Sequence, residues 1–335
     1  MAERDGAAAD AAAPEISVVV PIFNEASVLP ELQQRLGTVL AASCPDHEVI
    51  FVDDGSQDES PAMLLAAAAR DRRVRVLRFS RNFGHQAAVT AGIEHARGRA
   101  VVVIDADLQD PPEVIPELVA KWREGYDVVS AVRTERPGES AVRLLLIKVF
   151  YRVLKRIASV DMTPDVGDFR LLDRRVATAL NHLPERNRYV RGLIRWLGFR
   201  HVEVRYKRAE RFAGETKYPY TKLVRLALDG VTAFSTFPLR LVTYIGFAVS
   251  ALSVLLVAYA LLGLAGGHTP AGWTSVFVAV AFLSGVQLVA TGILGAYVSR
   301  IFEEVKGRPL YVVASDTAAP DPAGADRSAP RQESR

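Results

Sequence analysis

The fold of this chain is decided by residues 101–112, VVVIDADLQDPP. The apolar run Val101–Ile104 is short and rich in β-branched side chains, which is typical of a strand buried on both faces. The run ends at Asp105 and Asp107, two carboxylates one residue apart. Open α/β sheets bind ligands at the carboxyl ends of their strands, and paired carboxylates can hold a divalent cation with the phosphates of a nucleotide. We therefore expect the functional site at the end of this strand.

Strands and helices alternate around this stretch. Strand-like apolar runs fall at 15–21, 48–52, 74–79 and 127–132, and helical spacing falls at 26–41, 86–97 and 114–122. The alternation predicts an α/β fold with a parallel, doubly wound sheet. Asn24 and Glu25 follow the first strand, and Asp53 and Asp54 end the second. Because parallel strands end at one edge of a sheet, we expect these polar groups to gather there.

Composition separates a polar part of the chain from an apolar part. The 335 residues carry 41 Lys and Arg against 38 Asp and Glu, a net charge of +3 that fits an anionic partner without selecting one. A single cysteine, Cys44, excludes an intrachain disulfide and a cysteine-based zinc site. No Asp, Glu, Lys or Arg lies between Arg240 and Arg300, and residues 241–264 and 273–298 are each long enough to span a bilayer. Positive charges outside the two spans predict that both ends are cytoplasmic.

These boundaries define six segments. They are a disordered leader (1–14), a cytoplasmic domain (15–217), a juxtamembrane amphipathic helix (218–240), the two spans, and a cytoplasmic tail (299–335) that is mostly disordered from about Ala314. Basic and apolar residues also alternate at helical spacing over 142–157. That segment is interpreted either as a helix on the membrane surface or as a helix packed on the sheet or on a neighbouring subunit.

Six motifs carry a resemblance to one enzyme family. In chain order they are VVVPIFNEA (18–26), VDDGSQDES (52–60), RNFGHQAAVTAG (81–92), IDADLQDPPE (104–113), VGDFRLLDRR (166–175) and RFAGETKYPYTKL (211–223). Together they resemble the inverting family-two glycosyltransferases of GT-A fold, which implies a Rossmann-like, mixed and mostly parallel sheet flanked by helices. More narrowly, they resemble the polyprenyl-phosphate glycosyltransferases similar to dolichol-phosphate-mannose synthase and the bacterial GtrB-type enzymes. The resemblance covers roughly residues 16–308.

The resemblance implies a function. One sugar would pass from a nucleoside-diphosphate sugar to polyprenyl phosphate, such as undecaprenyl phosphate, in the bacterial inner membrane, with Mg²⁺ or Mn²⁺ as cofactor. UDP is expected as the nucleotide, and glucose or a hexosamine as the sugar, although mannose and an amino-arabinose also occur on such scaffolds. The product would serve cell-envelope glycans or lipid modification. We expect a homo-oligomer and no nucleic-acid partner.

The resemblance also assigns residues. Nucleotide contacts fall on Pro21, Phe23, Glu25, Asp53, Asp54, Arg81, Gly84, Asp105 and Ala106. Asp107 and Gln109 match the two residues that hold the metal ion in the family. The ion would stabilise the departing diphosphate, so Asp107 is also counted as catalytic. Asp110, before two prolines, is interpreted as a helix cap. His85 is expected to be a neutral hydrogen-bonding histidine, since no second His or Cys is spaced with it.

Asp168 matches the acidic position that the family uses as the acceptor-side base. A phosphate monoester has a second pKa of about 6 and is largely ionised at neutral pH, so an orienting role is the alternative. A salt bridge to Arg170, Arg174 or Arg175 is a third interpretation. The acceptor phosphate and the diphosphate would need donors and cations. The candidates are Arg133, Arg136, Arg211, Lys217 and Tyr218.

Two other functions stay open from the sequence. A processive polysaccharide synthase of the same superfamily would carry Q-x-x-R-W, but here Gly192 precedes Arg195 and Trp196 at the glutamine position. Two spans are also few for a polymer channel. A catalytically silent, nucleotide-binding membrane scaffold is the alternative from another class, and the intact acidic motif set argues against it.

Overall fold

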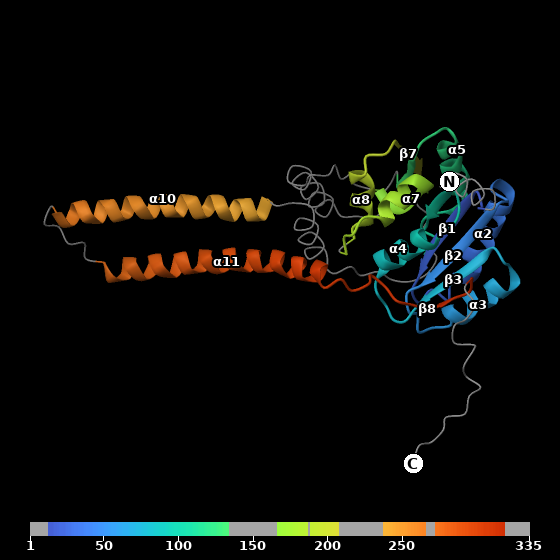
Figure 1. Ribbon diagram of the computed structural model, residues 1–335, viewed down its shortest axis with the longest axis horizontal. Helices are drawn as coiled ribbons and strands as arrows, with labels where there is room; N and C mark the ends of the chain where they lie inside the picture. Colours follow the sequence, from blue (N-terminus) through green and yellow to red (C-terminus); the bar gives the residue numbers. More distant parts are fainter. Residues whose placement is uncertain (1–12, 134–165, 187, 208–236, 266–271, 319–335) are drawn as a thin grey trace, which may run out of the picture. The chain divides into compact units, whose positions relative to one another are not determined.

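The computed structural model describes residues 13–133, 166–186, 188–207, 237–265 and 272–318 (Figure 1). The predicted leader up to residue 12, the segment 142–157 and most of the predicted helix 218–240 lie outside these residues. The chain divides into two compact units, one of residues 1–144, 162–217 and 308–335, the other of residues 145–161 and 218–307.

The first unit is built on a sheet of eight strands. They are β1 (Ile16–Ile22), β2 (His47–Asp53), β3 (Val74–Phe79), β4 (Ala100–Val103), β5 (Val128–Arg133), β6 (Val166–Asp173), β7 (His201–Tyr206) and β8 (Val313–Asp316). Their order in space is β7-β5-β6-β4-β1-β2-β3-β8, with β4, β1, β2 and β3 parallel. β6 runs antiparallel to both β4 and β5, and β8 runs antiparallel to β3. The mixed, mostly parallel sheet predicted from the sequence is confirmed.

Helices cover both faces of this sheet (Figure 1). They are α2 (Leu29–Ser43), α3 (Ser60–Arg70), α4 (His85–His95), α5 (Ile115–Arg123), α7 (Arg174–Asn181), α8 (Val190–Trp196) and the 3-10 turn η1 (Pro112–Val114). α2 contacts α5 and η1, whereas α4 contacts β1, β4 and α7. α4 comes so close to β1 that a Cβ at Gly92 would lie 2.1 Å from Val19 Cγ1. Glycine therefore sets the spacing of helix and strand here.

The strand predicted from residues 101–104 lies near the middle of the sheet. The side chains of Val101, Val102, Val103 and Ile104 are at most 1% exposed, so β4 and the residue after it are buried on both faces as their composition predicts. Each such side chain contributes roughly 1.5–3 kcal/mol through burial. Parallel pairing of β4 with β1 brings the chain after both strands to the same sheet edge.

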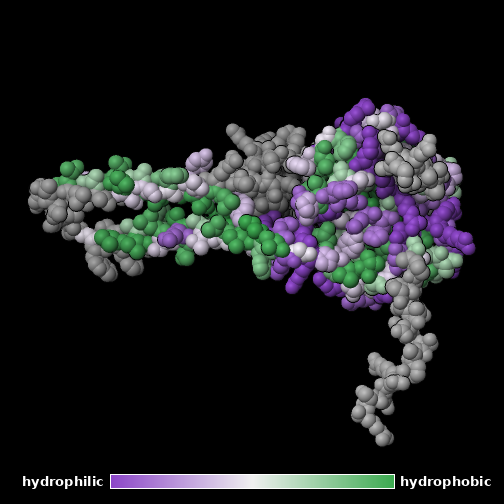
Figure 2. Space-filling model, viewed as in Figure 1, coloured by the Kyte–Doolittle hydropathy of each residue, from purple (hydrophilic) through white to green (hydrophobic). Residues whose placement is uncertain are grey.

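The second unit contains α10 (Phe237–Ala265) and α11 (Trp273–Val305), which contact each other and run side by side (Figure 1). They include both predicted spans, so the helical state of those stretches is confirmed. Figure 2 shows hydrophobic residues along much of the visible surface of both helices. By length and hydropathy, the described residues hold one candidate membrane span, Phe282–Val305, and a shorter apolar stretch, Leu241–Leu255. That both helices cross a membrane stays a prediction.

The C-terminal tail corrects one prediction. Residues 313–316, which overlap the stretch predicted to be disordered, form β8 on the free side of β3. The Asp316 carboxylate accepts two hydrogen bonds from Arg75, and the Thr317 hydroxyl accepts one from the Val76 amide. Tyr311 stacks on Phe79 with ring centroids 5.0 Å apart. Composition did not predict this strand because the side chains that attach it to the sheet bind residues at least 217 positions away in the chain. Such long-range contacts leave no trace in local composition.

Candidate active site

Three titratable side chains meet where β4 ends and β6 begins. Asp105 follows β4, Asp168 lies on β6, and His85 begins α4. His85 Nε2 lies 3.1 Å from Asp168 Oδ2 and 3.6 Å from Asp105 Oδ1. One ligand atom from each of the three lies within 4.8 Å of the others, so the group could hold a metal ion. The hydrogen-bonding role predicted for His85 agrees with this geometry, and its part in a metal-capable group was not predicted.

Asp168 is held by an arginine that the sequence did not single out. Arg191 Nε lies 2.7 Å from Asp168 Oδ1, and Arg191 Nη2 lies 2.8 Å from Oδ2. Burial alone would raise the pKa of Asp168, but hydrogen bonds from Arg191 and His85 and the Arg191 charge outweigh it and hold the pKa well below its usual range. The ion-pair partner of the Asp168 carboxylate is therefore Arg191. Arg170, one of the predicted partners, donates to the Asp168 backbone carbonyl instead.

Asp105 has the opposite electrostatic environment. Burial, with smaller contributions from the charges of Asp168, Asp110 and Asp107, raises its pKa to about 6. Its Oδ1 is buried and has no hydrogen-bond partner among the described residues. An unpaired buried carboxylate oxygen is costly unless a cation or a proton neutralises it. Oxygen donors of this kind suit Mg²⁺ or Mn²⁺, so the residues at this edge fit a divalent ion.

The predicted metal pair lies in the turn after β4. The backbone N–H of Gln109 donates to Asp107 Oδ1 at 3.1 Å, and Leu108 between them has a φ of +56°. A leucine in this left-handed region is uncommon and carries a local conformational cost. The assignment of Asp107 and Gln109 as ligands stays a prediction. Ala106, which lies between Asp105 and Asp107 in the chain, is buried.

The two aspartates that end β2 make contacts within the protein. Asp54 accepts hydrogen bonds from the amides of Phe83 (2.6 Å) and Gly84 (2.9 Å). Asp53 Oδ1 accepts from the Ser56 amide at 2.8 Å, and its Oδ2 lies 3.3 Å from Arg78 Nε. Both carboxylates are at most 3% exposed. They therefore shape the loops at this edge, and direct nucleotide contacts by Asp53 and Asp54 stay a prediction.

An open pocket of about 570 Å³ lies beside these loops, and Phe23 and Arg81 are among its lining residues. The Phe23 ring is 45% exposed at the end of β1. The Arg81 guanidinium lies 3.9 Å from the centroid of the Phe83 ring. Pro21 is buried within β1, and Glu25 hydrogen-bonds through its amide to the Ser60 hydroxyl. The predicted nucleotide-binding residues thus surround one sheet edge without all facing one pocket.

Asp110 corrects another prediction. Its carboxylate is 1% exposed and accepts hydrogen bonds from Tyr206 and from Arg133 Nη2, the latter at 3.3 Å. The following 3-10 turn has no side-chain cap, so Asp110 is not a helix cap. A buried carboxylate needs paired donors, and the distant β7 supplies one of them. Arg133, predicted to bind phosphate, is partly neutralised by this pair. Arg136, Arg211, Lys217 and Tyr218 lie outside the described residues.

Comparison with known proteins places the chain in a family. Residues 17–180 match Glycosyl transferase family 2. A Bacillus subtilis (strain 168) protein named "Uncharacterized glycosyltransferase YkcC" is 47% identical over 300 residues, covering 89% of this chain and 93% of its own. The chain belongs to glycosyltransferase family 2. The SfII prophage-derived bactoprenol glucosyl transferase of Shigella flexneri is 42% identical over 300 residues, covering 89% of this chain and 97% of its own.

One of the solved structures to which this glycosyltransferase is similar comes from Mycobacterium tuberculosis. Glucosyl-3-phosphoglycerate synthase from Mycobacterium tuberculosis in complex with UDP matches 67% of this chain and 80% of its own, with a TM-score of 0.46 and 22% identity. The resemblance to polyprenyl-phosphate enzymes rests instead on the full-length sequence relatives.

The sequence motifs of this family 2 glycosyltransferase did not reveal Arg191. It lies 23 residues after Asp168, in a short segment whose spacing looks like an ordinary helix surface. One signal was present, since Arg191 is next to Gly192, the position compared with Q-x-x-R-W. Arg78 was also missed because a strand arginine looks like a solvated charge.

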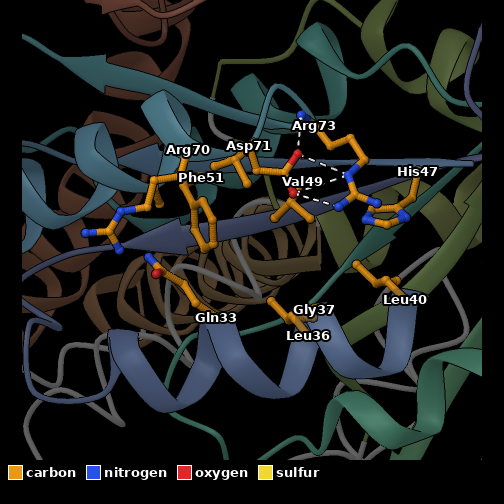
Figure 3. A pocket seen from close by; sticks show the side chains of 12 residues that line it. Gln33, Leu36, Gly37, Leu40, His47, Val49, Phe51, Arg70, Asp71 and Arg73 are labelled. Carbon is orange, nitrogen blue, oxygen red and sulfur yellow. Dashed lines mark hydrogen bonds and ion pairs between the residues drawn. The ribbon is translucent and has the colours of Figure 1, made fainter. Parts of the chain in front are cut away.

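A second pocket of about 220 Å³ lies between α2 and α3 (Figure 3). Its wall is apolar, with Leu36, Leu40 and Phe51, and the Arg73 guanidinium at its rim is bound to Asp71 by short hydrogen bonds. None of the predicted site residues of this glycosyltransferase lines it. Pockets at the carboxyl ends of strands are the usual ligand sites of such sheets.

Proposed function

We propose that this glycosyltransferase moves glucose from UDP-glucose to a polyprenyl phosphate, with inversion at the anomeric carbon. The bactoprenol glucosyl transferase from Shigella flexneri supports the acceptor and the sugar, because the alignment includes nearly its whole length. The long apolar α11 supports a catalytic unit held at a bacterial inner membrane, where a polyprenyl lipid resides.

The observation that carries the proposal is the pairing of Asp168. Both of its oxygens accept hydrogen bonds from Arg191, and Oδ2 also lies 3.1 Å from His85. A carboxylate held this way, with its pKa well below the usual range, is a weak base. A hydroxyl acceptor would need a base, whereas a phosphate monoester arrives already ionised. The geometry therefore favours a phosphate acceptor, with Asp168 as an orienting group.

The reaction is then a single displacement. An acceptor phosphate oxygen forms a bond to the anomeric carbon of glucose, and the bond from that carbon to the diphosphate oxygen breaks. Asp168 holds His85 and Arg191 in place beside the reacting groups, and the Arg191 side chain is 37% exposed, so that it can attract phosphate. Asp107 and Gln109, with Asp105 nearby, would hold the divalent ion. When bound, that ion supplies charge stabilisation for the departing UDP.

A transfer assay tests this function. The full chain in detergent or vesicles is given UDP-[¹⁴C]glucose, undecaprenyl phosphate and Mn²⁺, and label is followed into the organic phase. We expect label in a mild-acid-labile lipid, with less from UDP-N-acetylglucosamine and GDP-mannose. A long labelled polymer would instead indicate a processive synthase. Binding of UDP-glucose without metal-dependent release of UDP would indicate the non-catalytic scaffold.

A further inference from the structure

One wall of the 570 Å³ pocket comes from a part of the chain that no catalytic motif includes. The pocket lies at the ends of β1, β2 and β3, where Phe23, Gln57, Arg78 and Arg81 contribute to its lining. The remaining wall is β8, through Ala314 and Ser315. β8 follows α11 along the chain after residues 306–312. The tail after the membrane helices therefore completes a pocket among the strand ends.

The tail is fixed to the sheet by several independent contacts. Ser80 donates its amide to the Val312 carbonyl, and β8 pairs with β3 through Val313, Ser315 and Asp316. The Arg75–Asp316 ion pair is only 12% and 14% exposed. Contacts of this degree of burial hold a segment far better than a surface ion pair does. The position of Ser315 in the pocket wall is thus set by the packing of β8 on β3.

The chemistry of the pocket suits a nucleobase. An exposed aromatic ring at the rim, Phe23, offers a stacking surface. The Gln57 amide, the Ser315 hydroxyl and the Arg78 guanidinium offer donors and acceptors of the kind that read the polar edge of a base. The volume lies within the range of small-molecule pockets, roughly 300–1,000 Å³. Two of the lining residues, Phe23 and Arg81, also belong to the motifs that predict nucleotide contacts.

We propose that β8 forms one wall of the donor's nucleobase pocket, so that donor affinity depends on the attachment of the C-terminal tail to β3. This inference rests on the proposed use of a nucleotide-sugar donor. Ser315 contacts the base side of the donor, and Asp316 is a positioning residue that acts through Ser315. The tail has no part in the transfer step itself, so its loss affects donor binding and leaves the rate at saturating donor unchanged.

Two tail variants and two controls test the proposal in the full-length protein. Ser315→Trp fills the pocket while it keeps the ion pair, and Asp316→Ala removes the ion pair. Ala318→Trp adds the same bulk on an exposed tail position that does not line the pocket. Asp71→Ala breaks a different aspartate–arginine pair, that with Arg73. UDP, GDP, ADP and TDP are first titrated into the wild type by calorimetry, and the tightest ligand is used throughout.

We expect Ser315→Trp to weaken nucleotide binding by at least about tenfold, and Asp316→Ala to raise Kd and donor KM severalfold with kcat within about twofold. Both controls should stay within about twofold of the wild type. Tail variants that bind as the wild type does, or a wild type that binds none of the four nucleotides, would overturn the inference. If Asp316→Ala does not fold, the comparison of Ser315→Trp with Ala318→Trp decides.

The assay separates this inference from the proposed function. Weakened nucleotide binding in the tail variants, with no glucose transferred to lipid by the wild type, would leave the tail's role standing and refute the proposed acceptor. Normal glucose transfer by the wild type, with unchanged nucleotide binding in the tail variants, would leave the proposed acceptor standing and refute the tail's role.

Discussion

The carboxylates at the end of β2 and those where β4 ends and β6 begins look alike in sequence but differ in environment. Asp54 is saturated by two backbone amides, and so it holds a loop. Asp105 keeps a buried oxygen that has no hydrogen-bond partner among the described residues and lies 3.6 Å from His85 Nε2, and the neighbouring Asp168 accepts two hydrogen bonds from Arg191. The first cluster is held mainly by backbone amides of its own loops, whereas Asp168 in the second is held by side chains of α4 and α8. Paired acidic residues at a sheet edge therefore include both scaffold and chemistry, and only their partners distinguish the two.

The largest expected effect tests the chemical cluster. Asp107→Ala should lower glucosyl transfer by at least about a hundredfold at every Mg²⁺ or Mn²⁺ concentration, because a ligand that the ion needs is gone. Transfer is measured as label in lipid, and folding by thermal melting. Glu113→Gln, which removes a surface ion pair with Arg35, is the control and should retain nearly full transfer. Full turnover by Asp107→Ala would show that the metal assignment is wrong.

The next effect concerns the pairing of Arg191 with Asp168. In Arg191→Met, burial is no longer outweighed and the pKa of Asp168 rises, so the carboxylate becomes protonated as the pH falls. We expect kcat to fall roughly tenfold or more at pH 7 and to decline toward pH 5 more steeply than in the wild type, where protonation of the acceptor phosphate, with a second pKa of about 6, also lowers the rate. Arg191→Lys, which keeps the charge but not the two-bond geometry, should be intermediate. A pH–rate profile in Arg191→Met parallel to that of the wild type would contradict the orienting role.

Asp54 tests the scaffold side of the comparison. Asp54→Ala leaves the Phe83 and Gly84 amides without acceptors and should reduce the free energy of unfolding by about 1–3 kcal/mol. Asp54→Asn keeps one acceptor oxygen and should lose about half as much. Thermal melting measures both, and kcat of the folded fraction should change little. A variant that melts normally but has lost all donor binding would make Asp54 a nucleotide ligand, as the sequence predicted.

The smallest effect separates protein stability from catalysis at acid pH. Burial, with the charges of Arg195 and Arg170, lowers the pKa of His201 to about 4. In the unfolded chain its pKa is about 6.5, so the unfolded state gains a proton first and stability falls as the pH drops from about 6.5 toward 4. His201→Gln should remove about 1 kcal/mol of that loss at pH 5.5. Melting temperature against pH measures it, and an unchanged acid slope would contradict the argument.

The central part of the fold could be predicted because its signal is local. The short, β-branched apolar run before Asp105 favours a buried strand by its own composition. The alternation of such strands with helices predicts the parallel central part of the sheet. Motifs singled out Asp105 and Asp168, which lie together beside His85 in the structure, and their roles stay predictions. Arg191, the Asp110 partners and β8 could not be predicted in this way, because each depends on a contact between residues distant in the chain. A solvated arginine and a buried one look the same in a sequence.

The tail strand has a practical consequence for making a soluble enzyme. The usual approach is to end the chain before the long apolar helices α10 and α11, and this would also delete β8. The amides and carbonyls of β3 that now pair with β8 would then face water as an open sheet edge, which promotes association with other chains. A truncated protein is therefore expected to aggregate for a reason unrelated to the apolar helices. A version that replaces α10 and α11 by a flexible linker and keeps residues 308–318 retains the closed edge.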